Sequence, residues 1–242
     1  MTMTARLPLA IIQLESPPGA VSARVGEQAQ WFVAALELSA SDYIVVRPDR
    51  GEALPDVHAI SAAILSGSWA MVTDRADWSE RTAAWVRHAV AEQLPLLGVC
   101  YGHQLMSYAL GGNVGDNPAG WERGAVRVTG DAAMRQDPLL SALPDRFTAW
   151  LSHRQSVLTP PVGAQVLARS PQDGCQIIRY SAQALSVQFH PEFTPEIMTA
   201  CLQNSLSEVE VARLMTAQPV PQWPARLLGD FWQQVQPVAQ RA

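Results

Sequence analysis

The strand-like and helix-like runs within residues 94–110 constrain the fold more than any other part of this 242-residue chain. Residues 94–100 form a short apolar run, which is typical of a buried strand. Residues 104–110 follow at once with the spacing of a helix and end at Gly111 and Gly112. A strand that leads directly into a helix indicates a strand–helix unit of a parallel sheet.

The rest of the first half repeats this alternation. The pattern predicts strands at residues 9–14, 43–46 and 59–65, and helices at residues 25–38 and 78–93. After Gly112 the chain becomes richer in strands, which we expect at residues 124–128, 147–151, 165–169, 176–180 and 184–189. A helix at residues 196–217 and a last amphipathic helix at 227–238 complete the prediction. The sequence therefore predicts a single α/β domain with a mixed, largely parallel central sheet flanked by helices.

Charge and composition exclude several classes of protein. The chain has 17 basic and 22 acidic residues, a net charge of −5, and it lacks the basic footprint of a nucleic-acid or anionic-membrane binder. No apolar run approaches the roughly 20 residues of a membrane span. The three cysteines are too few and too far apart for a disulfide framework, and the N-terminus does not resemble a signal peptide. We therefore expect a cytoplasmic protein without nucleic-acid or membrane partners.

Cys100 stands at the junction of the predicted strand and helix, with Gly98 and Gly102 two residues away on either side. This arrangement has the shape of a nucleophile elbow, where side chains flanking so sharp a turn would collide. The N–H groups and dipole of the helix N-terminus favour a thiolate, and the N–H of Tyr101 is a ready donor to an oxyanion. The alternative interpretation of Cys100 alone is a small buried apolar residue.

A base for this thiol is predicted at the end of another strand. His190 ends the run at residues 184–189, and Glu192 follows two residues later, a spacing that puts alternate side chains on one side of an extended chain. Pro191 restricts the backbone between them. In α/β-hydrolases the acid precedes the histidine in the chain and is well separated from it, so the order found here argues against a cysteine-bearing member of that class.

Together the segments at 98–104 (GVCYGHQ) and 190–192 (HPE) resemble those of class I, triad-type glutamine amidotransferases, in particular the glutaminase domain of GMP synthetases and stand-alone relatives. The resemblance covers roughly residues 7–200. It implies a flavodoxin-like fold with a Cys100–His190–Glu192 triad and no metal or cofactor. Cys100 would attack the side-chain amide of L-glutamine, ammonia would leave, and water would hydrolyse the γ-glutamyl thioester.

Weaker segments extend the resemblance. The Ser66–Gly67–Ser68 turn resembles the family's oxyanion loop, in which the N–H groups of Gly67 and Tyr101 would act together. Gln104 matches a glutamine near the substrate, and segments 121–124 and 151–157 resemble two that line the substrate pocket, which makes Ser152 and His153 candidate substrate-binding residues. The family carries a second glycine and a proline where this chain has Ser68 and Trp69, and an acidic residue where it has Gln155.

Several alternatives stay open at this point. The same triad would also serve a γ-glutamyl peptidase or hydrolase, or the chain is an idle relative that acts as a binding module, although intact Cys100, His190 and Glu192 argue against that. The sequence allows a homo-oligomer and a separate synthetase or acceptor subunit. We divide the chain into an amidotransferase-like domain, 1–203, and a helical extension, 204–242, whose Phe231 and Trp232 would pack on the domain or on a second copy of the chain.

Overall fold

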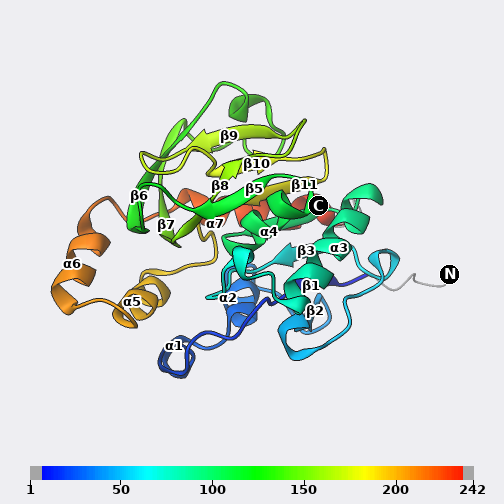
Figure 1. Cartoon of the computed structure of the whole chain (residues 1–242), viewed down its shortest axis with the longest axis horizontal. Helices are drawn as coiled ribbons and strands as arrows, with labels where there is room; N and C mark the ends of the chain where they lie inside the picture. The colour runs from blue at the N-terminus through cyan, green and yellow to red at the C-terminus, as the bar shows by residue number, and fades with distance from the viewer. Residues whose placement is uncertain (1–6, 237–242) are drawn as a thin grey trace.

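The computed structural model of the protein describes residues 7–236, which are built around a nine-stranded β-sheet (Figure 1). In spatial order its strands are β2 (Tyr43–Val46), β1 (Leu9–Ile12), β3 (Ala62–Leu65), β4 (Leu96–Val99), β11 (Ala184–Val187), β10 (Ile177–Arg179), β9 (Gln165–Arg169), β6 (Glu122–Gly130) and β7 (Arg146–His153). The first five are parallel, and β10, β9, β6 and β7 pair antiparallel with their neighbours. A separate antiparallel pair joins β5 (Asn113–Asp116) to β8 (Gln155–Thr159).

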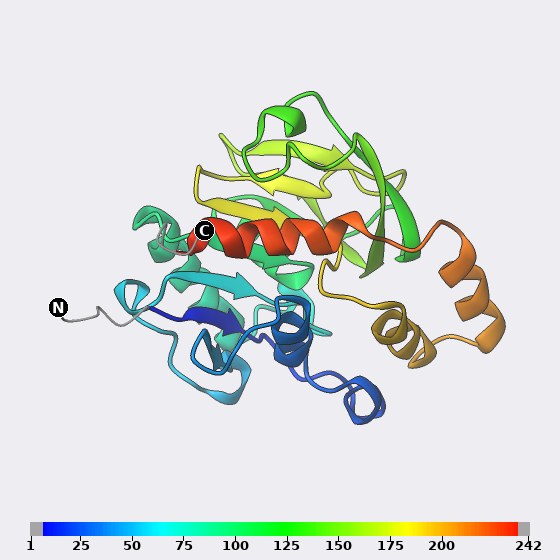
Figure 2. The ribbon, with the colours of Figure 1, turned by 180° about the vertical axis from the view of Figure 1, so that it is seen from behind.

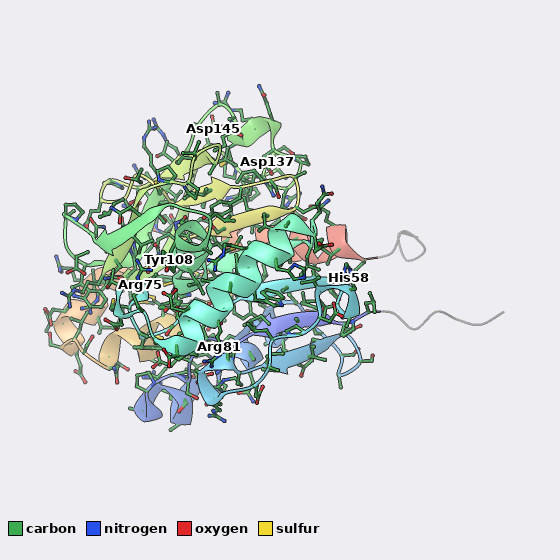
Figure 3. The ribbon with its side chains drawn as sticks, turned by 45° about the vertical axis from the view of Figure 1, so that its right-hand side comes forward. His58, Arg75, Arg81, Tyr108, Asp137 and Asp145 are labelled. Carbon is green, nitrogen blue, oxygen red and sulfur yellow. The ribbon has the colours of Figure 1, made fainter. Side chains whose placement is uncertain are left out.

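The two faces of the sheet are covered because successive strand residues point to opposite sides. In β1, Leu9 and Ile11 pack in the core beneath α2 (Gln28–Ala35) and α7 (Trp223–Val235), while Ala10 and Ile12 belong to the core beneath α3 (Asp77–Ala91) and α4 (Tyr101–Ala109). Figure 2 shows α7 crossing the sheet on the first face, and Figure 3 looks onto α3 on the other. The predicted α/β class with a mixed, largely parallel sheet is confirmed.

Two predicted helices are interrupted. The run at 25–38 contains the end of α1 (Gly19–Val25) and all of α2, which are separated at Gly26, a residue in the left-handed region with φ 78°. The run at 196–217 divides into α5 (Pro195–Gln203) and α6 (Glu208–Thr216), and the Ser207 hydroxyl accepts a hydrogen bond from the N–H of Glu210 to cap α6. Hydrophobic periodicity continues through both interruptions, so periodicity alone did not reveal them.

The last helix packs on its own chain. Leu227, Leu228, Phe231 and Trp232 of α7 are buried in the core that α2 and β1 share. The amphipathic helix expected at 227–238 is thus present as α7, although its last predicted residues lie outside the part of the chain that the structure describes. Of the two surfaces expected to receive Phe231 and Trp232, the core of the same chain is the one that they contact.

Candidate active site

Cys100 has the backbone geometry of a nucleophile elbow. It links β4 to α4 with φ 52° and ψ −102°, in the half of backbone space that non-glycine residues rarely enter. Its neighbours leave no room for side chains. A Cβ on Gly98 would lie 2.7 Å from the carbonyl oxygen of Gly102, and one on Gly102 would lie 2.5 Å from that of Leu65. The two glycines therefore allow the turn to pack against β3 and α4.

His190 and Glu192 meet Cys100 because β4 and β11 are adjacent and parallel, with Val99 opposite Val187. The chains that leave these strands therefore emerge at the same edge of the sheet. The Nδ1 atom of His190 lies 2.8 Å from Oε1 of Glu192 and donates a hydrogen bond to it. Both side chains are buried. The other ring nitrogen is not used by this bond, and Cys100 lies near enough to raise the pKa of the imidazole.

The charges around His190 favour its protonated form. Burial by itself would lower the pKa of this imidazole, but Glu192 and Cys100 outweigh burial and raise the pKa well above its ordinary value. The ring also stacks on Phe193 at 3.9 Å between centroids, and Phe193 meets the edge of Trp31 in α2 at 5.4 Å. The imidazole is thus held both electrostatically and by packing.

The loop after β3 reaches the same point. A Cβ on Gly67 would lie 3.1 Å from Cε1 of His190 and 3.7 Å from Cβ of Cys100, so the Gly67 backbone adjoins both residues. The carboxylate of Glu15 fixes the loop, since its Oε2 atom accepts hydrogen bonds from the Ser68 hydroxyl and from the next two backbone N–H groups at 2.7–2.9 Å. Tyr101 is the first residue of α4, where an N–H group has no partner within the helix.

The three predicted substrate-binding residues border a pocket that also contains Cys100 and His190. Nε2 of Gln104 donates to the carbonyl of Gln155 at 2.6 Å and to the side chain of Gln188 at 3.0 Å. Ser152 is half-buried on the pocket wall. His153 is buried, and both of its ring nitrogens are occupied, by Oε2 of Glu122 and by the carbonyl of Gln155, each at 2.9 Å.

The environment of His153 is the one grouping of metal-ligand type that residues 7–236 contain. Ligand atoms of Glu122, His153 and Asp173 lie within 4.8 Å of one another, all three buried. However, Nε2 of His153 already hydrogen-bonds to Glu122, which also accepts from Ser170 and Gln176. Burial raises the pKa of Asp173, which favours its uncharged form here. These contacts describe a hydrogen-bonded cluster that orients His153. The absence of a metal at this site stays a prediction.

Sequence reasoning missed several residues of the pocket wall, which come from four segments far apart in the chain. They are Gln28, Trp69, Met71, Trp121, Arg123, Cys201, Asn204 and Ser205. Segment 121–124 had carried a resemblance to a pocket-lining segment, but nothing in it singled out Arg123. Asn204 and Ser205 reach the pocket because the helix expected at 196–217 breaks there.

Fold and site together define an α/β protein with a cysteine at a strand–helix elbow and a histidine–glutamate pair after the adjacent strand. Within that class, the chain belongs to the family glutamine amidotransferase class-I, which it matches over residues 30–209. The resemblance noted in the sequence is thereby confirmed.

Two relatives illustrate the similarity. Over 142 residues the chain is 37% identical to the glutamine-hydrolysing GMP synthase of Aeropyrum pernix, a match that covers 59% of this chain and 25% of that protein. Over 99 residues it is 39% identical to a subunit of the glutamine-hydrolysing GMP synthase of Ignicoccus hospitalis, which covers 40% of this chain and 50% of that protein. The similarity thus spans between a quarter and a half of these relatives.

Solved structures share the fold over nearly the whole chain. A glutamine amidotransferase from Methylobacillus flagellatus superposes with a TM-score of 0.74, at 24% identity and 96% coverage of both chains. A glutamine amidotransferase from Thermotoga maritima gives a TM-score of 0.75, at 18% identity, and covers 94% of this chain and 97% of that one.

Proposed function

We propose that this chain hydrolyses the side-chain amide of L-glutamine through a γ-glutamyl thioester on Cys100. One observation carries the proposal: Cys100 occupies a strained elbow beside an imidazole that a buried carboxylate, Glu192, holds in place. A nucleophile, a base and a group that orients the base are the requirements of covalent catalysis of this kind. Membership of the amidotransferase family supports glutamine as the substrate.

In the first half of the reaction, the Cys100 thiolate attacks the amide carbon of glutamine. The carbonyl oxygen becomes an oxyanion, which the N–H groups of Gly67 and Tyr101 would stabilise. His190, protonated and held by Glu192, donates its proton to the amide nitrogen as the C–N bond breaks. Ammonia departs, and the γ-glutamyl group remains bound to sulfur as a thioester.

In the second half, neutral His190 accepts a proton from water as the water oxygen attacks the thioester carbon. The same two N–H groups, from Gly67 and Tyr101, stabilise the second oxyanion. The C–S bond breaks, glutamate leaves, and the thiolate and imidazolium return to their starting states. The sum is glutamine plus water giving glutamate plus ammonia, and no redox step occurs.

We propose that Gln104 and Ser152 contact the glutamyl part of the substrate directly, since both border the pocket. His153 would act differently, because both of its ring nitrogens are already hydrogen-bonded. We assign it the role of shaping the wall through its buried bond to Glu122. This modifies the simple substrate-binding role that the resemblance implied for His153.

The destination of the ammonia is a separate question. We propose a partner protein that carries the acceptor, as the name of the Ignicoccus hospitalis relative suggests for that protein. Here Gln155 bonds within its own chain, with its Nε2 atom donating to the Thr73 hydroxyl at 2.7 Å, and it supplies no charge to a partner.

No helix within residues 7–236 has the length and apolarity needed to cross a membrane. Three expectations stay predictions: a cytoplasmic location, a homo-oligomer, and the division of the chain into a domain at 1–203 and an extension at 204–242.

The test measures glutamate released from L-glutamine by the purified chain. We expect Cys100→Ser to lose at least about 100-fold in kcat/KM, because covalent catalysis is removed. Cys175→Ala is the matched control, since Cys175 is a buried thiol that does not border the pocket. Mass spectrometry of the quenched wild-type enzyme should detect a γ-glutamyl adduct on the peptide that contains Cys100. A Cys100→Ser variant with most of the activity would refute the mechanism.

The alternative function, hydrolysis of larger γ-glutamyl compounds, uses the same steps with an amine other than ammonia as leaving group. The feature that favours it is the half-buried, positively charged side chain of Arg123 on the pocket wall. Release of glutamate from γ-glutamyl dipeptides, but not from glutamine, would make this alternative the function.

A further inference from the structure

We propose that Arg123, stacked on Trp121 at the edge of the pocket, binds a carboxylate of the substrate and so contributes to the specificity of the site. The proposal rests on the hydrolytic function proposed above, and it adds a specificity-determining residue that neither the sequence motifs nor the family membership indicated.

The pocket lining contains basic but no acidic side chains, although the chain as a whole carries a net charge of −5. Among its described lining residues are two arginines, Arg123 and Arg154, and two histidines, but no aspartate or glutamate. Arg154 is exposed and already pairs with Asp116, at 3.1 Å between Nη2 and Oδ2. The charge of Arg123 is therefore the one left for a ligand.

Arg123 is held in place without being neutralised. Its guanidinium carbon lies 3.6 Å from the centroid of the Trp121 ring, a distance typical of a cation–π contact. Within residues 7–236, no hydrogen bond or ion pair engages the guanidinium, and the acidic residue that attracts it at longer range is Glu210 of α6. Burial lowers the pKa of Arg123, but an arginine stays charged at neutral pH. This half-buried cation has the N–H donors that a carboxylate would satisfy.

The strand register places Arg123 beside Ser152 on the pocket wall. In the β6–β7 pair, Arg123 is directly opposite Ser152, and Glu122 is directly opposite His153. Directly opposed residues project to the same face of a sheet, and adjacent residues project to opposite faces. Glu122 and His153 accordingly hydrogen-bond to each other on one face, and Arg123 and Ser152 share the other. Arg123 and Ser152 both border the pocket, which His153 also reaches. A planar guanidinium on this wall matches the geometry of a carboxylate.

Two carboxylates could supply this ligand. Every glutamyl substrate carries an α-carboxylate, and a γ-glutamyl amino acid carries a second one on the amine side of the scissile bond. Three substrates separate these sources: L-glutamine, γ-glutamylglycine, and γ-glutamylmethylamide, whose amine side is uncharged.

The main experiment measures kcat/KM of wild type, Arg123→Gln and Arg123→Lys with these substrates. Arg154→Gln is the matched control, because it removes a charge from the same wall that is already paired. We expect Arg123→Gln to lose about 10- to 100-fold, chiefly through KM, and Arg123→Lys to recover part of the loss. A loss with all three substrates assigns the α-carboxylate, and a loss confined to γ-glutamylglycine assigns the carboxylate of the leaving group. Changes below about threefold with every substrate would overturn the proposal.

A second measurement does not depend on turnover. Iodoacetylglycine and iodoacetylglycinamide alkylate a thiolate by the same displacement of iodide, but only the first carries a carboxylate. Wild type and Arg154→Gln should react with the anionic probe at Cys100 faster, relative to the neutral probe, than Arg123→Gln does. If the chain hydrolyses none of the substrates but shows this difference, the proposed function fails and the carboxylate site stands. If hydrolysis proceeds and neither measurement depends on Arg123, the site fails and the function stands.

Discussion

The carboxylate of Glu192 offers a sharp test of how the site sets the charge of its base. Its Oε1 atom accepts the hydrogen bond from His190, whereas Oε2 is buried without a hydrogen-bond partner in the described part of the chain. Glu192→Gln can therefore keep an oxygen toward Nδ1 while it removes the negative charge. The substitution changes the electrostatics of His190 more than the shape of the site.

The magnitude follows from the interaction that is lost. A hydrogen bond to a charged group contributes about 1.5–3 kcal/mol and a neutral one about 0.5–1.5 kcal/mol, so the exchange removes about 1–1.5 kcal/mol. If this stabilisation is needed in the transition state, kcat/KM falls by about 5- to 15-fold. The pH profile should change as well. Since Glu192 helps to raise the pKa of His190, its removal lowers that pKa, and the imidazolium is lost at a lower pH. The alkaline limb of the kcat/KM profile therefore moves to lower pH.

The assay is glutamate release from pH 5 to 10, with Glu196→Gln as control, because Glu196 is an exposed carboxylate in the first turn of α5. Thermal unfolding of each variant establishes that the comparison concerns folded protein. A Glu192→Gln enzyme within threefold of wild type, with an unmoved alkaline limb, would refute the assigned role of this carboxylate.

Three further outcomes are expected. Gly102→Ala should lower the free energy of unfolding in urea by about 1–3 kcal/mol, because its Cβ would lie 2.5 Å from a backbone oxygen, whereas Gly174→Ala, with open space around it, should change it little. Iodoacetamide at pH 7 should modify Cys100 first, as peptide mass spectrometry can measure, because burial raises the pKa of the other two thiols to about 11 and about 12. Leu227→Ala should cost about 2–5 kcal/mol of stability in urea, since this side chain of α7 is fully buried in the core, and exposed Gln233 in the same helix provides a neutral control.

The parts of the site that could be predicted are those encoded locally. Gly98 meets a steric need that arises within five residues. His190 and Glu192 are two residues apart and hydrogen-bond to each other, although they do so across a turn at 191–192 and not along the expected extended segment. The sequence also implied that these segments meet, because both follow apolar strands of a parallel sheet. Only the pairing of β4 with β11, seen in the structure, makes the two strand ends adjacent.

The pocket wall could not be predicted in the same way, because it depends on register between distant strands. Arg123 faces the pocket because it is opposite Ser152, and a shift of one residue would direct it elsewhere. The helix break that brings Asn204 and Ser205 to the pocket did have a local signal. Ser207 and Glu210 have the spacing of a capping box, and both of its hydrogen bonds form at the start of α6.

In the proposed mechanism the reacting groups are separate from the groups that would select the substrate. Cys100 and His190 follow adjacent parallel strands, β4 and β11, so their relative placement is fixed by backbone pairing in the centre of the sheet. Between these strands in sequence, the chain forms β5 to β10, including the β6–β7 wall that carries Arg123. Substitutions on that wall can therefore alter charge and size at the pocket without moving the elbow or the histidine. For this reason a change at Arg123 should act chiefly through KM, whereas a change at Glu192 should lower kcat/KM for every substrate and move the alkaline limb of its pH profile.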